Sequence, residues 1–238
     1  MRTDSTYRPD PRDPAGDAAA PPVPGRAALQ EAFAGRAMDA SATGFVLAVL
    51  PAGTAPILWV QDRSSRREGG RPYLPGAGKP APLAPILRVE VSHPRDVLWT
   101  MEEGAACAGL SAVVGEIHGD PAVLDFTATK RLALRAEASG VPVWLIRTGG
   151  AAGLSAARER WRIGALPSSP HPHDPAAPGA PLWAAELFRA RGRPPGRWEA
   201  HREPGGAGGG AADRLRLVPP PRDRAVAPGR SGAHAAGA

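Results

Sequence analysis

The chain has 238 residues, 58 of them Gly or Pro and 42% of them apolar, which allows one packed domain with Gly- and Pro-rich ends. The net charge is +6, but residues 191–238 carry +5 and the other 190 residues only +1, so charge does not mark the ordered part as a nucleic-acid-binding domain. The longest apolar runs, such as Gly44–Leu50, are far shorter than the roughly 18 residues that a membrane helix needs, which excludes a transmembrane protein. The single cysteine and the lack of an apolar leader predict a protein of the reducing cytoplasm.

Residues 1–26 are rich in Pro and charged residues and show no apolar periodicity, which predicts a disordered segment. From Ala27, short β-type runs alternate with helical stretches. The expected segments are, in chain order, Leu29–Phe33, Thr43–Leu50, Ile57–Val60, a loop over Arg63–Pro85, Ile86–Val91, a helix over Asp96–Ala108, Leu110–Val114, a helix over Asp125–Ser139, and Val141–Arg147. This alternation predicts an α/β fold with a parallel sheet, because only a crossover can join parallel neighbours.

The two helices have apolar residues at helical spacing and recognisable ends. We expect Asp96 to cap the first helix, Asp125 to cap the second, and Gly140 to end the second in the left-handed conformation. The runs SAVVG and VPVWLI are apolar throughout and predict central strands covered on both faces. Six further side chains are expected to be buried: Trp59, Trp99, Cys107, Trp144, Trp161 and Trp183.

Beyond Arg158 the sequence changes to short strand candidates separated by Pro- or Gly-rich spacers. These candidates are Trp161–Ala165, Leu182–Ala190, Arg197–His201 and Leu215–Val218. The GGAGGG stretch at 205–210 predicts a flexible insert, and residues 219–238 predict a disordered tail. The expected division is a core over 27–165 and a strand extension over 166–218.

Several segments in fixed order resemble the ImuA family, the RecA-related proteins of bacterial mutagenesis cassettes. They are AALQEAFAG, TGFVLAVL, PILWVQD, DVLWTMEEGAACAGLSAVVGEI, DFTATKRLALRAEASGVPVWLIR and WRIGALPSSPHPHDPAAPGAPLWAAELFRARGRPPGRWEAH, together covering residues 27–218. The resemblance implies a RecA-like core and a non-catalytic accessory role in SOS-induced, error-prone translesion DNA synthesis. It also implies ImuB, a DnaE-type error-prone polymerase and RecA as partners, with the C-terminal region taking part in contacts.

A RecA-like ATPase needs a strand followed by GxxxxGK[ST], in which the Lys reaches the outer phosphates and the hydroxyl binds magnesium. The corresponding stretch AGRAMDASATGF contains Gly35, Thr43 and Gly44 but no Lys. Glu116 follows a predicted strand and is either a relic of the magnesium-binding carboxylate or a solvated strand end. Asp62 is the only acid where a water-activating Glu is expected. We therefore expect a degenerate site without a cofactor; the alternative is an ATPase with a non-standard phosphate loop.

DNA contacts in RecA-like proteins come from loops after two central strands, here residues 116–123 and 148–155. The second, TGGAAGLS, has no cation for phosphate, so a RecA-style filament on DNA is not expected. If Leu182–Arg193 is extended, period two places Arg189, Arg191 and Arg193 on one face. Together with Arg197 and Trp198, these side chains are predicted to contact a partner protein or DNA; the alternative is a solvated edge strand.

Two other interpretations are weaker. His171 and His173 have the H-x-H spacing of metal ligands, but no third or fourth ligand is apparent, so no metal site is expected. Because division inhibitors share distant similarity with the RecA fold, a damage-induced regulator of cell division is a further alternative function.

Overall fold

The computed structural model describes residues 26–35, 38–50, 53–73, 84–174, 176–203 and 214–221. The predicted N-terminal disorder up to residue 25, the GGAGGG insert, and the predicted tail from residue 222 onward lie outside them. The strands are β1 (Leu29–Ala34), β2 (Ile57–Asp62), β3 (Ile86–Val91), β4 (Ala112–His118), β5 (Val143–Thr148), β6 (Glu159–Leu166), β7 (Leu182–Ala190), β8 (Gly196–Glu203) and β9 (Arg214–Val218). The helices are α1 (Ser41–Val49), α2 (Arg63–Gly69), α4 (Pro94–Ala105) and α5 (Phe126–Ser139).

All nine strands of the described chain belong to one sheet, in the order β3-β2-β4-β5-β1-β6-β7-β8-β9. Neighbours from β3 to β6 pair in parallel, and β7, β8 and β9 continue the sheet as antiparallel strands. This arrangement confirms the predicted α/β class, with a mainly parallel RecA-like core and short C-terminal strands. The first strand, β1, lies in the middle of the sheet between β5 and β6, so the chain entering α1 leaves from its centre.

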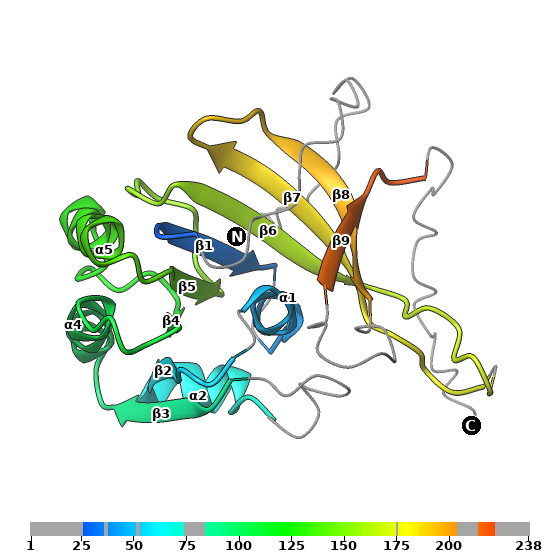
Figure 1. Cartoon of the computed structure of the whole chain (residues 1–238), viewed down its shortest axis with the longest axis horizontal. Coiled ribbons are helices and arrows are strands. Elements are labelled where there is room, and N and C mark those ends of the chain that lie inside the picture. Colours follow the sequence, from blue (N-terminus) through cyan, green and yellow to red (C-terminus); the bar gives the residue numbers. More distant parts are fainter. Residues whose placement is uncertain are drawn as a thin grey trace, which may run out of the picture.

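Helices cover both faces of the sheet (Figure 1). Helices α4 and α5 pack side by side on one face, whereas α1 lies on the other and contacts β1, β5, β6 and β9. Each face has its own apolar core. The core on the α1 side is rich in aromatic rings, supplied by Phe45, Trp59, Trp144, Trp161, Trp183 and Trp198. Four of the five tryptophans predicted to be buried are therefore confirmed, but Trp99 is 64% exposed on α4.

The helix ends are partly as predicted. Asp125 caps α5 by accepting a hydrogen bond from the backbone amide of Ala128, and Gly140 ends that helix with φ 79°, as expected. The prediction that Asp96 caps α4 is wrong, because Pro94 starts the helix one turn earlier and His93 is the N-cap. Helix α4 also ends sooner, at Ala105, so Cys107 lies in the following turn and is exposed rather than buried.

Two other element predictions need correction. Part of the predicted loop over Arg63–Pro85 is helix α2, which begins because Asp62 accepts a hydrogen bond from the amide of Ser65. Strand β4 does not occupy Leu110–Val114 but Ala112–His118, two to four residues later. No helix of the described residues is long and apolar enough to cross a lipid bilayer.

Candidate functional site

The turn between β1 and α1 lies where a RecA-like ATPase holds phosphates. If the GxxxxGK[ST] pattern is placed with its first glycine on Gly35, Ala40 takes the second Gly position, Ser41 the Lys position and Ala42 the Ser/Thr position. The Ser41 side chain is buried and its Oγ donates to the carbonyl oxygen of Ile163 at 3.0 Å. Ala42 is fully buried. These positions therefore supply neither an ammonium group nor a free hydroxyl.

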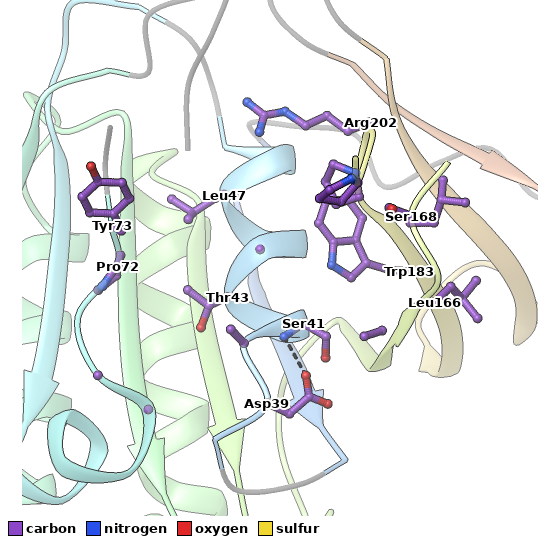
Figure 2. A pocket seen from close by; sticks show the side chains of 18 of the residues that line it. Asp39, Ser41, Thr43, Leu47, Pro72, Tyr73, Leu166, Ser168, Trp183 and Arg202 are labelled. Atoms are coloured by element: carbon purple, nitrogen blue, oxygen red, sulfur yellow. Dashed lines mark hydrogen bonds between the residues drawn. The ribbon is translucent and has the colours of Figure 1, made fainter. Parts of the chain in front are cut away.

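The amino end of α1 has an anion of its own. The Asp39 carboxylate accepts a hydrogen bond from the backbone amide of Ser41 at 2.8 Å, drawn as the dashed line in Figure 2. The free amides and the dipole at a helix start attract negative charge, and they are the groups that bind phosphate in nucleotide sites. A phosphate here must displace Asp39 or lie beside its negative charge.

Glu116 does not lie at a solvated strand end, so that alternative is wrong. It lies within β4 and is only 5% exposed. Its two carboxylate oxygens each accept one hydrogen bond at 2.9 Å, from Trp59 Nε1 and from Gln61 Nε2. Burial raises the pKa of the Glu116 carboxyl to about 7, although these two donors favour the charged form. The carboxylate is thus turned inward and held by protein groups.

The partners of Glu116 were missed in the sequence because they belong to the neighbouring strand β2. The parallel register places Gln61 next to Glu116. The sequence did contain one signal for this contact: the polar residue Gln61 directly follows the apolar run ILWV. The nearby acid, Asp62, is 1% exposed and is engaged in capping α2 at 2.7 Å.

A cleft of about 700 Å³ lies beside α1. It brings together three of the four predicted remnant residues, Thr43, Gly44 and Glu116, whereas exposed Gly35 is outside it. Figure 2 shows Thr43 and Leu47 of α1 between two walls, which carry the labelled residues Pro72 and Tyr73 on one side and Leu166, Ser168, Trp183 and Arg202 on the other.

Gly44 has a packing role in this cleft. A Cβ atom at this position would be 3.1 Å from Trp183 Cζ2, so the glycine lets α1 approach the indole ring. Two cations line the cleft among the described residues, Arg71 and Arg202. Arg71 is bound to Glu90, with Nε and Oε1 2.6 Å apart. The cleft therefore combines aromatic and aliphatic side chains with the acidic groups of Asp39 and Glu116 and the two guanidinium groups, and its described residues include no lysine.

The predicted one-sided row of three arginines is wrong. Strand β7 ends at Ala190, and the chain turns at Gly192, which has φ 87°. Arg193 comes back to the sheet, where its Nη2 donates to Glu159 at 3.0 Å and its guanidinium lies over the Trp161 ring. Arg189 and Arg191 remain exposed. The extended geometry was lost because a glycine in the left-handed region starts a turn.

The other two predicted contact residues lie on β8. Trp198 is 5% exposed and its ring centroid is 5.9 Å from that of Trp161, which places it in the core rather than on a contact surface. Arg197 Nη2 donates to Glu186 Oε1 at 3.2 Å across the β7–β8 pair.

The histidine pair lies in the connection between β6 and β7. The His171 and His173 rings are 5.9 Å apart and edge to face. Across the described ranges, no group of three or more His, Cys, Asp or Glu side chains is arranged to hold a metal ion.

Comparison with known proteins gives one consistent result. No protein-family model matches the sequence. Two curated proteins named Protein ImuA, from the NA1000 / CB15N and the ATCC 19089 / CIP 103742 / CB 15 strains of Caulobacter vibrioides, are each 34% identical to the chain over 186 residues. The similarity covers 74% of this chain and 71% of each relative.

Proposed function

This chain belongs to the ImuA family, and from that premise we propose that it is an accessory protein of SOS-induced, error-prone translesion DNA synthesis that does not hydrolyse ATP. It works through protein contacts with ImuB, a DnaE-type polymerase and RecA. The observation that carries the proposal is the turn before α1, where Ser41 stands at the position of the phosphate-binding lysine and is bound to Ile163.

Two further features support the absence of turnover. Asp39 already occupies the anion-attracting helix start, so the site repels the group that it would have to bind. Glu116, the counterpart of a magnesium-binding carboxylate, has both oxygens engaged by Trp59 and Gln61. A magnesium ion at this carboxylate would lie beside an indole N–H and an amide N–H whose positive ends point at the same two oxygens, which opposes cation binding there.

We expect the purified protein to show no magnesium-dependent ATP hydrolysis above background and no rise in melting temperature with magnesium and ATP. A ligand that binds only the folded state at 100 times its dissociation constant stabilises it by about 2.7 kcal/mol, so binding would be visible. The measurements are phosphate release and a thermal melt with and without nucleotide. Turnover that Glu116→Gln abolishes would contradict the proposal.

The same thermal melt distinguishes the proposed accessory role from the alternative function. The cleft of about 700 Å³ beside α1 is large enough for a ligand and is the observation that favours a nucleotide-dependent ATPase with a non-standard phosphate loop. A clear rise in melting temperature with ATP, lost on removal of magnesium, would favour that alternative. A rise with ATP but no phosphate release would indicate a nucleotide-binding scaffold.

Partner contacts through the C-terminal arginines can be tested by separating exposed from buried charges. We expect the double change Arg189→Gln and Arg191→Gln to weaken partner capture and to change the free energy of unfolding by less than about 0.5 kcal/mol, because both side chains are exposed. Arg193→Gln is the matched control. It should cost about 1–3 kcal/mol of stability, because Glu159 is buried and loses a charged donor. Capture unchanged in the double variant would leave Arg189 and Arg191 as a solvated strand end.

Partner capture should be measured with the full chain. Strands β7 and β8 contribute Trp183 and Trp198 to the core, so a deletion from residue 182 removes part of the hydrophobic interior. Loss of binding in such a deletion would report unfolding as well as loss of a contact surface. Co-purification of tagged full-length protein with ImuB, RecA and the DnaE-type polymerase, each tested separately, is the direct test of the proposed function.

A further inference from the structure

The last strands of the sheet have one face that no helix of the described residues covers. Helix α1 lies on the opposite face, where it contacts β6 and β9. Helix α4 packs on β2, β3 and β4, and α5 packs on β1 and β5, so β7, β8 and β9 extend past both helices (Figure 1). Two small residues mark this open face: Ala184 is exposed, and a Cβ atom at Gly164 would have no tertiary neighbour within 4 Å.

The alternation of side chains along the strands decides which groups lie on the open face. The residues that pack into the core on the α1 side are Trp161, Ile163, Ala185, Leu187, Trp198, Ala200, Leu215 and Leu217. The charged residues that alternate with them, and so lie on the open face, are Arg162 of β6, Glu186 of β7, Arg197 and Glu199 of β8, and Arg216 of β9.

The cations of the open face are more exposed than its acids. The exposed fraction of the side chain is 47% for Arg162 and 33% for Arg197, but 19% for Glu186 and 14% for Glu199. Glu186 is shared, because its Oε2 accepts from Arg162 at 3.3 Å and its Oε1 accepts from Arg197 at 3.2 Å. Arg216 is exposed on β9. The outermost charges of this face are therefore positive.

The charge of the whole C-terminal region has the same sign. Residues 182–238 contain ten arginines and five acids, which gives +5 of the net charge of +6 of the chain. None of these cations is a lysine. The planar guanidinium group matches the geometry of phosphate oxygens, and neutralising phosphates releases their counterions. The region thus complements a chain of phosphate groups.

One arginine of the open face lies on an aromatic ring. The Arg162 guanidinium is over the Phe188 ring, 4.0 Å from its centroid. Phe188 is half-buried and packs edge to face on Phe33, with ring centroids 5.7 Å apart, so the sheet fixes this pair. Unpaired bases stack on arginine planes and aromatic rings, whereas the bases of a duplex are already stacked and an acidic peptide has no bases. The pair therefore favours a single strand as the ligand.

We propose that the open face binds single-stranded nucleic acid, with phosphates beside Arg162, Arg197 and Arg216 and a base stacked on the Arg162 guanidinium. This binding site goes beyond the proposed function, which requires only protein contacts. It also differs from the one-sided row of arginines expected from the sequence, because β6, β7, β8 and β9 all contribute to it.

The triple change Arg162→Gln, Arg197→Gln and Arg216→Gln tests this site. We expect the affinity of the full chain for an oligothymidylate of about 20 nucleotides to fall by at least about tenfold at a salt concentration of about 0.1 M. The slope of log affinity against log salt concentration should decrease by about 2, because each of three phosphate contacts contributes about 0.7 on a single strand. The measurement is fluorescence anisotropy of the labelled oligonucleotide at several salt concentrations.

The matched control removes three exposed cations from the helices, by Arg67→Gln on α2, Arg95→Gln on α4 and Arg135→Gln on α5. It has the same net charge as the test variant. Its affinity should stay within about threefold of wild type, because charges further away than the Debye length of about 10 Å are screened. Circular dichroism and thermal melts check that both variants are folded. An equal loss of affinity in both would show that overall charge, and not the open face, attracts the oligonucleotide.

The outcomes separate this inference from the proposed function. Wild-type protein that does not bind the oligothymidylate overturns the inference and leaves the proposed protein contacts standing. Wild-type protein that binds it but captures none of ImuB, RecA and the DnaE-type polymerase overturns the proposed function instead. If polyglutamate or a duplex of the same length competes as well as the single strand, the face recognises charge alone and the inference fails.

A second variant tests the stacking contact. Arg162→Lys keeps the charge but removes the planar guanidinium group. We expect it to weaken binding of the oligothymidylate by at least about fivefold, as for loss of one stacked base, without a change in the salt slope. Arg197→Lys is the control and should bind within about twofold of wild type, because lysine also serves as a point charge for phosphate. Equal affinities of the two lysine variants would refute the stacking on Arg162.

Discussion

Replacing Arg160 with Met is expected to lower the free energy of unfolding by about 3–5 kcal/mol, because it leaves the Glu31 carboxylate buried without its cation. Glu31 is fully buried and Arg160 is 3% exposed. Arg160 Nε donates to Glu31 Oε2 at 2.6 Å, across the direct β1–β6 neighbour pair. The guanidinium also lies 5.2 Å from the ring centroids of both Phe33 and Phe188. Urea denaturation at neutral pH measures the loss.

Two variants show whether the buried pair causes this loss. Arg162→Met lies two residues along the same strand, where Arg162 is 47% exposed and 3.3 Å from Glu186, and should cost less than about 1 kcal/mol. The double change Glu31→Met and Arg160→Met should recover much of the stability, since no unpaired charge is left. A cost for Arg160→Met no greater than that for Arg162→Met would disprove the assignment.

The second large effect is a dependence of stability on pH that Glu116 causes. The folded protein raises the pKa of this carboxyl from 4.5 to about 7 by burial. Between these values the folded state keeps a proton that the unfolded state has released, so stability falls as pH rises from 4.5 to 7 and is level above that range. A shift of this size corresponds to about 3 kcal/mol.

Glu116→Gln removes this titration. We expect the difference in unfolding free energy between Glu116→Gln and wild type to move in favour of the variant by about 3 kcal/mol between pH 4.5 and pH 8. Glu137→Gln, which changes an exposed acid on α5, should follow the wild-type profile. Denaturant curves at several pH values provide the test. Parallel profiles for wild type and Glu116→Gln would show that Glu116 does not titrate in this range.

The carboxylates of Glu116 and Asp39 bear on the function in the same way. In a RecA-like motor, acidic side chains near the phosphates are available to a metal ion or to water. Here Glu116 is held by Trp59 and Gln61, and Asp39 is held by the start of α1. Acidic groups that are already hydrogen-bonded within the protein fit a fold used for assembly, which is the role that we propose.

Much of the fold could be predicted because it depends on local patterns. The runs that became β1, β5 and β7 are apolar enough to mark strands, and Asp125 with Gly140 marks both ends of α5. Helix α2 was not predicted, since its seven residues RSSRREG have no apolar stripe and depend on one capping bond from Asp62. The exposure of Trp99 was also missed, although Trp99 lies off the side of α4 that carries the buried residues Val97 and Met101 at helical spacing.

The candidate site, too, could be predicted from the sequence only in part. The absence of a lysine before α1 is a property of the sequence, as are the alternation of strands and helices and the similarity to the ImuA family. Tertiary structure alone decided that Asp39 binds the helix start, that β2 supplies the donors for Glu116, and that Gly192 turns Arg193 back onto the sheet. Chain composition fixes which chemical groups exist, whereas strand register, burial and loop closure between distant segments determine which of those groups meet and which remain exposed.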